Sequence, residues 1–240
     1  MISVCMATYN GSRYIQKQLD SILAQLEPSD EIILVDDCSS DATIELARDM
    51  RDERIKIHRN DTNQGAVSTF ELAIRLASGN VIFLSDQDDI WYRHKVKQFL
   101  NVFNGHPDVT LVVSDANVIN ETDDVVATSY FESRGGFSAG LWHNIVKCKY
   151  LGCTMAFRHT VAERCLPFPK DIPMHDVWIG CVNSIYGKTY LLDFPLMGYR
   201  RHRYNVTPSK RRGLAQISNS RWRLVKNLLF KVFTGNRVAS

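Results

Sequence analysis

The chain has 240 residues, of which 45% are hydrophobic and 23% charged, a composition typical of a soluble globular protein with one large domain or two small ones. No apolar run approaches the roughly 18 residues of a membrane span, and the first residues lack the charged and apolar regions of a signal peptide, so we expect a cytoplasmic protein. The six cysteines are scattered without a CxxC pair, which argues against a disulfide framework or a zinc site and predicts reduced, mostly buried thiols.

The net charge of +3 hides an uneven distribution along the chain. No acidic residue follows Asp193, whereas this last segment holds 11 of the 29 lysines and arginines. Residues 1–193 therefore carry 18 basic residues against all 26 acidic ones. An acidic body with a basic tail indicates contact with an anionic surface, either a membrane or a nucleic acid.

The first half of the chain alternates short apolar runs, rich in β-branched residues, with stretches of helical periodicity. Residues 2–6 and 31–35 are predicted to be buried parallel strands. The helix predicted between them, over residues 12–26, places its apolar side chains on one face: Ile15, Leu19, Ile22, Leu23 and Leu26. Ser12 begins this stretch and is available as its N-cap.

The same alternation continues beyond the second strand. A polar turn and a helix follow it, and then come a strand at 54–59, a helix at 68–77, a strand at 81–84, a helix at 94–103 and a strand at 109–114. This order predicts an α/β fold with a mostly parallel sheet flanked by helices.

The pattern loosens between residues 115 and 140, and then gives a strand at 151–158, a helix at 175–187 and a strand at 188–200. We therefore predict one continuous domain over residues 1–207. Its nucleotide-type half covers residues 1–115, and a smaller mixed α+β half covers residues 116–207. Residues 208–240 form a basic tail.

Polar side chains follow three of the predicted strands at their carboxyl ends: Thr8, Tyr9 and Asn10; Asp36 and Asp37; and Asp86, Asp88 and Asp89. In an open parallel sheet such ends meet at one rim, where ligands bind. An aromatic ring, an amide and a carboxylate suit a nucleobase, with Tyr9 stacking on it and Asp37 accepting the N3–H of a uracil or thymine. No GxGxxG follows the first strand and no GxxxxGK(S/T) occurs, so neither a dinucleotide nor a P-loop site is indicated.

The stretch "VIFLSDQDDIW" crowds three carboxylates at the mouth of a buried strand. Like charges at such distances raise one another's pKa and oppose folding. A divalent metal with oxygen ligands would relieve this repulsion and would also neutralise the diphosphate of a nucleotide. The alternative is a solvated acidic turn in which Asp89 caps the next helix.

Four stretches resemble the successive motifs of the family 2 glycosyltransferases: "ISVCMATYNGSRYIQKQLDSILAQ", "EIILVDDCSSDAT", "GNVIFLSDQDDIW" and "MHDVWIG". Members of this family are inverting enzymes with the Rossmann-like GT-A fold that transfer sugars from nucleotide diphosphates. The likeness covers roughly residues 2–207. Within the family, "SDQDDIW", "MHDVW" and "GYRRH" are most similar to bacterial rhamnosyltransferase-like members that build surface polysaccharides.

This resemblance implies roles for the residues at the rim. It places Thr8, Tyr9 and Asp37 on the nucleotide base, with Asn10 beside them. It places Asp86 near the ribose and the metal, and Asp88 on the metal itself, which we expect to be Mn²⁺ or Mg²⁺.

The resemblance also makes Asp176 the general base that deprotonates the acceptor hydroxyl. From the residues alone, Asp176 opens a predicted helix, where its charged form would be favoured and where it would equally serve as a plain cap. Asp89 is the next candidate for the base. Gly152 and Cys153 correspond to an acceptor-side strand of the family, although packing roles fit them equally well.

The stretch "GYRRHRYN", residues 198–205, corresponds to the position where family members carry a His or Arg near the diphosphate. Arg200 and Arg201 are predicted to neutralise the leaving group, and His202 to reach the metal. The alternative is a set of solvent-exposed charges beside a flexible tail.

The tail contains a basic amphipathic stretch at residues 221–233. A helix there would place Trp222, Val225, Leu229, Val232 and Phe233 on one side and Arg223, Lys226 and Asn227 on the other. Such a helix can lie in the headgroup region of an anionic membrane. Docking on its own domain or on a partner chain is the alternative.

The sequence therefore predicts an inverting, metal-dependent transferase of the cytoplasm, peripheral on the inner face of the cell membrane. Its donor would be a UDP- or dTDP-sugar, with dTDP-rhamnose one candidate. Its acceptor would be a hydroxyl of a surface polysaccharide, such as an O-antigen of lipopolysaccharide, or of a lipid-linked oligosaccharide. A sugar-nucleotidyltransferase is the alternative enzyme, but "MATYNGSRY" lacks the Gly-rich basic loop of that class. A nucleic-acid-binding protein is disfavoured because the body is acidic and no binding motif is present.

Overall fold

The apolar runs of the N-terminal half form four parallel strands: β1 (Ile2–Thr8), β2 (Glu31–Asp36), β3 (Ile55–Arg59) and β4 (Val81–Ser85). β1 lies between β2 and β4, and β3 pairs with the outer side of β2. All residues of β2 and β4 are buried, because helices cover both faces of this part of the sheet. The connecting helices are α1 (Ile15–Leu23), α2 (Thr43–Asp49) and α3 (Ala66–Leu76).

The computed structural model describes residues 1–202 and 213–235 of the chain. Its second half extends the sheet with β5 (Ile90–Trp91), β6 (Val109–Ile119), β7 (Val125–Ala127), β8 (Met155–Arg158) and β9 (Lys188–Arg200). Across the described residues, the strand order is β3-β2-β1-β4-β8-β6-β9-β5, with β7 beside β6. β8 runs antiparallel to β4 and β6, whereas β9 runs parallel to β6. The predicted α/β fold with a mostly parallel sheet and a mixed second half is confirmed.

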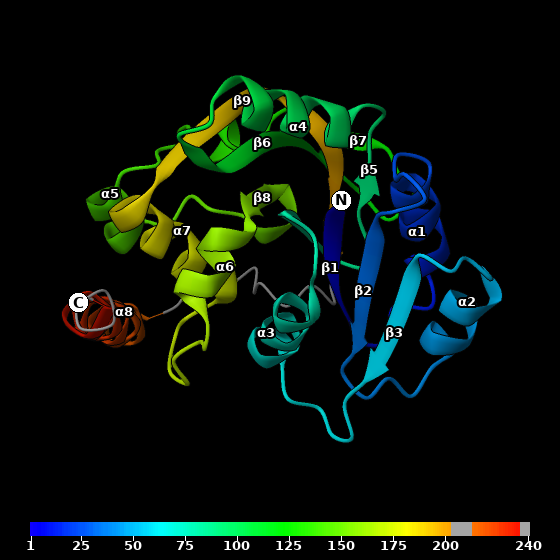
Figure 1. Ribbon diagram of the computed structural model, residues 1–240, viewed down its shortest axis with the longest axis horizontal. Helices are drawn as coiled ribbons and strands as arrows, with labels where there is room; N and C mark the ends of the chain where they lie inside the picture. The colour runs from blue at the N-terminus through cyan, green and yellow to red at the C-terminus, as the bar shows by residue number, and fades with distance from the viewer. Residues whose placement is uncertain (203–212, 236–240) are drawn as a thin grey trace.

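The helices form two layers around this curled sheet (Figure 1). One core contains side chains from α1, α2 and α4 (Lys95–Gly105). The other contains side chains from α3, α6 (His159–Cys165), α7 (His175–Tyr186) and α8 (Leu214–Gly235). Short helices complete the fold: α5 (Leu141–Val146) and the 3₁₀ turns η1 (Glu132–Arg134) and η2 (Gly152–Thr154). In Figure 1, α5 and α8 lie at one end of the molecule and α1 and α2 at the other.

Several predicted boundaries are wrong for identifiable reasons. The helix predicted from Ser12 begins only at Ile15, and the amide of Ser12 donates to Asp41 Oδ2 (3.1 Å), so Ser12 does not cap it. The strand predicted to end at residue 114 continues to Ile119. It continues because the buried carboxylate of Asp115 accepts backbone amides of a following turn, including that of Tyr130 (3.1 Å).

The second half departs from the predicted elements in two further places. The strand predicted at 151–158 begins only at Met155, since the residues before it form η2. Helices α5 and α6 were not predicted, because they are too short to give a clear helical period. The six cysteines, all within residues 1–202, are free, and four of them are buried, as the sequence predicted. In the described part of the chain, no helix has both the length and the apolarity that crossing a membrane requires.

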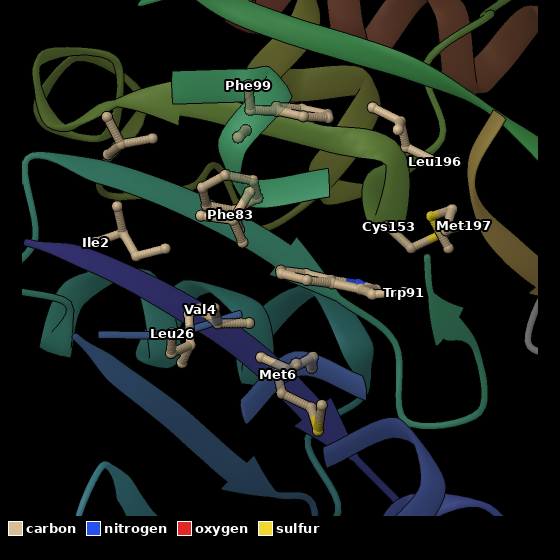
Figure 2. Packing of buried hydrophobic residues seen from close by; sticks show 14 of the residues in the cluster. Ile2, Val4, Met6, Leu26, Phe83, Trp91, Phe99, Cys153, Leu196 and Met197 are labelled. Atoms are coloured by element: carbon tan, nitrogen blue, oxygen red, sulfur yellow. The ribbon is translucent and has the colours of Figure 1, made fainter. Parts of the chain in front are cut away.

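An aromatic cluster packs beneath the loop that follows β4. Phe83 packs against Trp91 and Phe99, with ring centroids 5.5 and 5.2 Å apart (Figure 2). Phe83 and Phe99 are fully buried, and Trp91 nearly so. The three rings come from β4, β5 and α4, so they fix both ends of the acidic loop against the core.

We expect Phe83→Ala to destabilise the protein by about 3–5 kcal/mol, the usual cost of a cavity of this size in a core. Urea unfolding measures the loss. Val126→Ala is the matched control, because Val126 is exposed on β7, and we expect it to cost less than about 0.5 kcal/mol. Equal losses for the two variants would show that the aromatic cluster does not stabilise the fold as described.

Candidate active site

The polar residues that follow β1, β2 and β4 meet at one edge of the sheet, as predicted from their strands. Thr8 is paired with Asp36, and Met6 with Ser85, so the three loops leave the sheet side by side. Gln87 joins two of these loops: its Oε1 accepts the amide of Tyr9 (2.8 Å), and its Nε2 donates to the carbonyl of Tyr9 (3.0 Å). The ring of Tyr9 is half-exposed. Sequence reasoning missed Gln87, although it lies within the acidic motif.

Two of the predicted nucleotide-binding residues have structural roles in these loops. The hydroxyl of Thr8 is buried and donates to Asp36 Oδ1 (3.0 Å), so its side chain fixes the end of β1, and a contact of Thr8 with the base stays a prediction. Asn10 has a left-handed backbone (φ 49°), and its Oδ1 accepts the amide of Ser40 (2.9 Å). Asn10 thus fixes the turn after β2 next to the turn after β1.

Asp37 organises the loop that leads into α3. Its Oδ1 accepts hydrogen bonds from Asn60 Nδ2 and the amide of Gln64 (both 2.8 Å), and its Oδ2 accepts the amide of Gly65 (2.8 Å). The carboxylate is nearly buried. Asp37 therefore shapes the site in addition to any contact with a base. Asn60 also belongs to this loop network, and nothing in the sequence indicated its role.

The three carboxylates after β4 are enclosed and do not form a solvated turn. Asp88 and Asp89 are buried, and Asp89 Oδ1 accepts the amide of Arg200 (2.9 Å). Asp89 does not cap the next helix, because α4 begins only at Lys95, so the capping alternative is wrong. Asp88 Oδ2 lies 2.6 Å from Nε2 of His202, which brings together the two residues predicted to share a metal.

The carboxylates of this cluster disfavour one another's ionisation. Burial raises the pKa of Asp86 to about 7, and the charges of Asp88 and Asp176 act in the same direction. Burial and the charges of Asp88 and Asp86 also raise the pKa of Asp89. Asp89 Oδ2 is buried and has no hydrogen-bond partner within the described residues. An orphaned oxygen among crowded carboxylates is the environment that a divalent cation with oxygen ligands would satisfy.

Cys153 takes part in the same cluster. A ligand atom from each of Asp86, Asp89 and Cys153 falls within a group whose members lie no more than 4.8 Å apart. Burial, and then the charges of Asp89 and Asp86, raise the pKa of the Cys153 thiol. The thiol therefore keeps its proton and is a poor metal ligand, which leaves the carboxylate oxygens as the groups suited to Mn²⁺ or Mg²⁺.

A buried lysine lies beneath the carboxylates and was not predicted. Lys95 Nζ donates to the carbonyl of Cys153 (2.7 Å) and lies 4.5 Å from the ring centroid of Trp91. Burial lowers the pKa of Lys95 to about 8, although the charges of Asp89 and Asp86 oppose this shift. The sequence did contain a signal for this burial, because Lys95 lies on the face of α4 that packs against the core. Lys95 supplies positive charge from below the site.

Arg200 has a structural role that the sequence did not predict, and its contact with a diphosphate stays a prediction that its hydrogen bonds do not favour. Its guanidinium is buried and donates to the carbonyls of Asp88 (2.6 Å) and Asn120 (2.7 Å) and to Asp123 Oδ1 (2.5 Å). It also lies 4.5 Å from the ring centroid of Tyr14. With these donors engaged inside the protein, Arg200 holds the acidic loop against the β6–β7 turn.

Arg201, predicted for the diphosphate, and His202, predicted for the metal, follow Arg200 in the same motif. Arg201 is partly buried, and its Nη1 donates to the hydroxyl of Tyr199 (3.3 Å). His202 is half-buried and stacks on Tyr14 with a centroid distance of 5.5 Å. Residues 203–205 of the same motif, and residues 208–212 of the predicted tail, lie outside the described residues.

Asp176 occupies the first turn of α7, as its sequence context predicted. Its Oδ2 accepts the amide of Gly152 (3.2 Å), and its Oδ1 accepts the amide of Val177 (2.7 Å). Burial raises the pKa of Asp176 to about 6, although these amide hydrogen bonds oppose the rise. Gly152, whose amide bonds to Asp176, directly precedes Cys153, whose thiol lies in one group with Asp86 and Asp89, so Asp176 neighbours the acidic cluster and its charge helps to raise the pKa of Asp86.

Gly152 is required by close packing beside Asp176. A Cβ atom at this position would lie 2.8 Å from Nε2 of His175. The imidazole of His175 cannot easily move, since it is buried and stacks on Phe70 with a centroid distance of 4.0 Å. Gly152 therefore allows its own amide to reach Asp176 and orient the carboxylate.

A comparison with known families now identifies the chain. The model of glycosyl transferase family 2 matches residues 3–166, more than half of the sequence. The chain belongs to this family. Membership favours the glycosyltransferase over the sugar-nucleotidyltransferase and the nucleic-acid-binding protein, and this chain is a glycosyltransferase.

Relatives of this glycosyltransferase extend the match beyond the first half. WfaP of Escherichia coli, a UDP-Glc:alpha-D-GlcNAc-diphosphoundecaprenol beta-1,3-glucosyltransferase, is 26% identical over 91% of the chain and 84% of its own length. An uncharacterized glycosyltransferase of Nostoc sp. is 29% identical over 85% of the chain. The chain spans 66% of that relative.

Solved structures with the same fold include S. aureus TarS in complex with UDP-GlcNAc, with a TM-score of 0.74 and 17% identity over 96% of the chain and 66% of TarS. The mannosyltransferase PcManGT of Pyrobaculum calidifontis, in complex with GDP-Man and Mn²⁺, has a TM-score of 0.62 and 18% identity over 97% of the chain and 64% of its own length. At these identities the likeness establishes the fold, which is of the GT-A type.

We expect Gly152→Ala to lower the rate of sugar transfer by about tenfold or more, because the new methyl group displaces His175 and with it Asp176. Nucleotide affinity, measured by calorimetry, should stay unchanged, since the strand-end loops are untouched. Gly105→Ala is the matched control, because a Cβ atom there meets nothing within 4 Å. A Gly152→Ala enzyme with full activity would show that this packing does not position Asp176.

Proposed function

We propose that this glycosyltransferase transfers a sugar from a UDP-sugar, with inversion, to a hydroxyl of a lipid-linked saccharide used for a bacterial surface polysaccharide. One observation carries the proposal: Asp176 lies next to the acidic cluster, because its carboxylate accepts the amide of Gly152 and the thiol of the following residue, Cys153, lies in one group with Asp86 and Asp89. A base for the acceptor and a site for the donor's charged phosphates are thus adjacent, as a single displacement requires.

The relatives support the substrate classes. WfaP and WfgD of Escherichia coli are both named for transfer from UDP-Glc to GlcNAc-diphosphoundecaprenol, and TarS was crystallised with UDP-GlcNAc. A lipid diphosphate carrying one or more sugars is accordingly the acceptor class that we assign. dTDP-rhamnose stays a candidate donor, because uracil and thymine present the same N3–H to the protein.

The donor would lie across the carboxyl ends of β1, β2 and β4. The half-exposed ring of Tyr9 is suited to stacking on the base beside the loop that Asp37 organises. Asp86 would lie near the ribose. Arg201 is the remaining candidate for contact with the departing diphosphate, because the guanidinium of Arg200 is held inside the fold.

The carboxylate cluster would hold Mn²⁺ or Mg²⁺. Asp88 and His202 are the assigned ligands, with Asp86 and the orphaned oxygen of Asp89 next to them. A bound divalent cation supplies the counter-charge for the developing diphosphate. Binding would also remove the repulsion that raises the pKa of Asp86 and Asp89.

Asp176 is the assigned general base. Within the part of the chain that the structure describes, it accepts hydrogen bonds only from backbone amides, so one face of its carboxylate is suited to taking the proton of the acceptor hydroxyl. Its pKa of about 6 keeps it ionised at neutral pH. Asp89 is the poorer candidate, because it lies among other carboxylates and is held by the amide of Arg200.

The acceptor class places the enzyme at a membrane surface. A saccharide on a lipid diphosphate stays within reach of the bilayer, so an enzyme that attaches peripherally to the inner face of the membrane would meet its substrate there. The basic C-terminal segment, without an acidic residue after Asp193, favours such attachment to anionic lipids.

The test is a transfer assay with a synthetic saccharide on a lipid diphosphate, using UDP-sugars and dTDP-rhamnose in turn. We expect one UDP-sugar to be transferred, and Asp176→Asn to lower the rate about 10²-fold without loss of nucleotide affinity. Because Asp176 must be ionised to act, the rate should fall about tenfold per pH unit below about pH 6. Transfer by Asp176→Asn at the wild-type rate would remove Asp176 as the base, and transfer only from dTDP-sugars would contradict the assigned donor.

Nucleotide binding should depend on a divalent cation. We expect UDP affinity in calorimetry to fall about tenfold or more in the presence of chelator, and Mn²⁺ binding alone to weaken similarly in Asp88→Asn. Asp108→Asn is the control, since Asp108 is an exposed carboxylate paired with Lys188. UDP binding that is indifferent to both the chelator and Asp88→Asn would show that the cluster holds no cation.

A further inference from the structure

One face of α8 is docked on the body of the enzyme. Leu224 and Leu228 are buried in the same core as α7, and α8 packs against both α5 and α7. Asn227 Nδ2 donates to Asp171 Oδ1 (2.7 Å), and Lys231 Nζ donates to the carbonyl of Leu166 (3.2 Å). The docking that the sequence left open as an alternative therefore holds for this face of the helix.

The opposite face of α8 is also apolar, and it is exposed. Trp222, Lys226, Leu229 and Phe233 are spaced four, three and four residues apart and so share a face. Among the described residues, Trp222 is 66% exposed and Phe233 71% exposed. Phe230, on the same side, is exposed as well.

The amphipathic face predicted from the sequence is thus partly wrong. Val225 and Val232 were assigned to the same side as Trp222 and Phe233, but both are only half-exposed. The helix has two apolar faces, of which Leu224 and Leu228 mark the docked one. If the helix had a single apolar face, docking on the body would bury it and leave no apolar face exposed.

Helix α5 continues the exposed apolar surface. Arg221 donates to the carbonyl of Val146, which joins α8 to the end of α5. Trp142 is 74% exposed, and Val146 is exposed beside it. We define the α5–α8 surface as the exposed apolar side chains of these two adjacent helices: Trp142, Val146, Trp222, Leu229, Phe230 and Phe233.

The charges around the α5–α8 surface are positive. Residues 213–235 contain no acidic residue, and Arg223, Lys226 and Lys147 are exposed. The carboxylate that contacts α8 within the described residues, Asp171, lies on the docked side and is bonded by Asn227. Tryptophans and phenylalanines flanked by lysine and arginine match the interfacial region of an anionic bilayer.

We propose that the α5–α8 surface binds the surface of an anionic lipid bilayer. The choice of a lipid occupant rests on the proposed function, because a lipid-linked acceptor is delivered at that surface. The position of the surface agrees with this choice: α7 carries Asp176 at its first turn and packs against both α5 and α8. Helix α7 thus carries the assigned base and also supports the two helices that form the α5–α8 surface.

The experiment is flotation of the full chain with vesicles of phosphatidylcholine and phosphatidylglycerol, and with vesicles of phosphatidylcholine alone. We expect binding to the mixed vesicles, with partitioning lowered about tenfold or more by Trp222→Glu and by Phe233→Glu. Val126→Glu is the matched control, since Val126 is an equally exposed apolar residue on β7, and it should float like wild type. Melting temperatures should agree across the set, because each changed side chain is exposed.

The charges are tested separately from the apolar side chains. Replacing Arg223 and Lys226 together with Gln should weaken binding to the mixed vesicles and leave any binding to phosphatidylcholine unchanged. Unchanged flotation of Trp222→Glu and Phe233→Glu would overturn the proposal. The proposal would also be overturned if the wild-type protein did not float and formed a dimer in analytical ultracentrifugation, and if both variants were monomeric. The surface would then join two copies of the chain.

Transfer to a short-chain, water-soluble acceptor analogue separates this inference from the proposed function. Retained transfer in Trp222→Glu together with lost flotation supports the lipid-binding surface. If wild type floats through Trp222 and yet transfers no sugar, the proposed function fails while the surface stands.

Discussion

The crowding of three carboxylates in the loop after β4 is the constraint around which this part of the molecule is arranged. Asp88 and Asp89 are buried, and burial raises the pKa of Asp86 and Asp89. Unbalanced negative charge in a low-dielectric site opposes folding. Three sets of contacts hold the loop in place: the aromatic cluster of Phe83, Trp91 and Phe99, the buried Lys95, and the buried guanidinium of Arg200.

The two buried cations explain how the fold tolerates this arrangement before any ligand arrives. Lys95 bonds to the carbonyl of Cys153, and Arg200 bonds to the carbonyl of Asp88. Each contributes positive charge next to the loop through a bond to a backbone carbonyl. The carboxylate oxygens of the loop are the kind of group that a divalent cation would require.

The position of the proposed base outside the acidic loop follows from the topology. Asp176 comes from α7, beyond the antiparallel strand β8, and its carboxylate is oriented by the backbone amides of Gly152 and Val177. It therefore avoids the direct crowding that affects Asp86 and Asp89, and its pKa rises only to about 6. Two groups of carboxylates with different environments can perform different tasks in one site.

The sequence by itself determined the α/β order and the meeting of strand-end side chains at one rim, because apolar periodicity and strand direction are local properties of the chain. The expectation that His202 lies near the acidic motif came from the family resemblance. Only the tertiary structure decided what each polar group contacts. The roles of Arg200, Thr8 and Lys95 depend on partners from other elements, and Asp115 lies within a strand because a distant turn satisfies its carboxylate. The buried face of α8 was likewise decided by its neighbours, since a helix with two apolar faces does not specify which one docks.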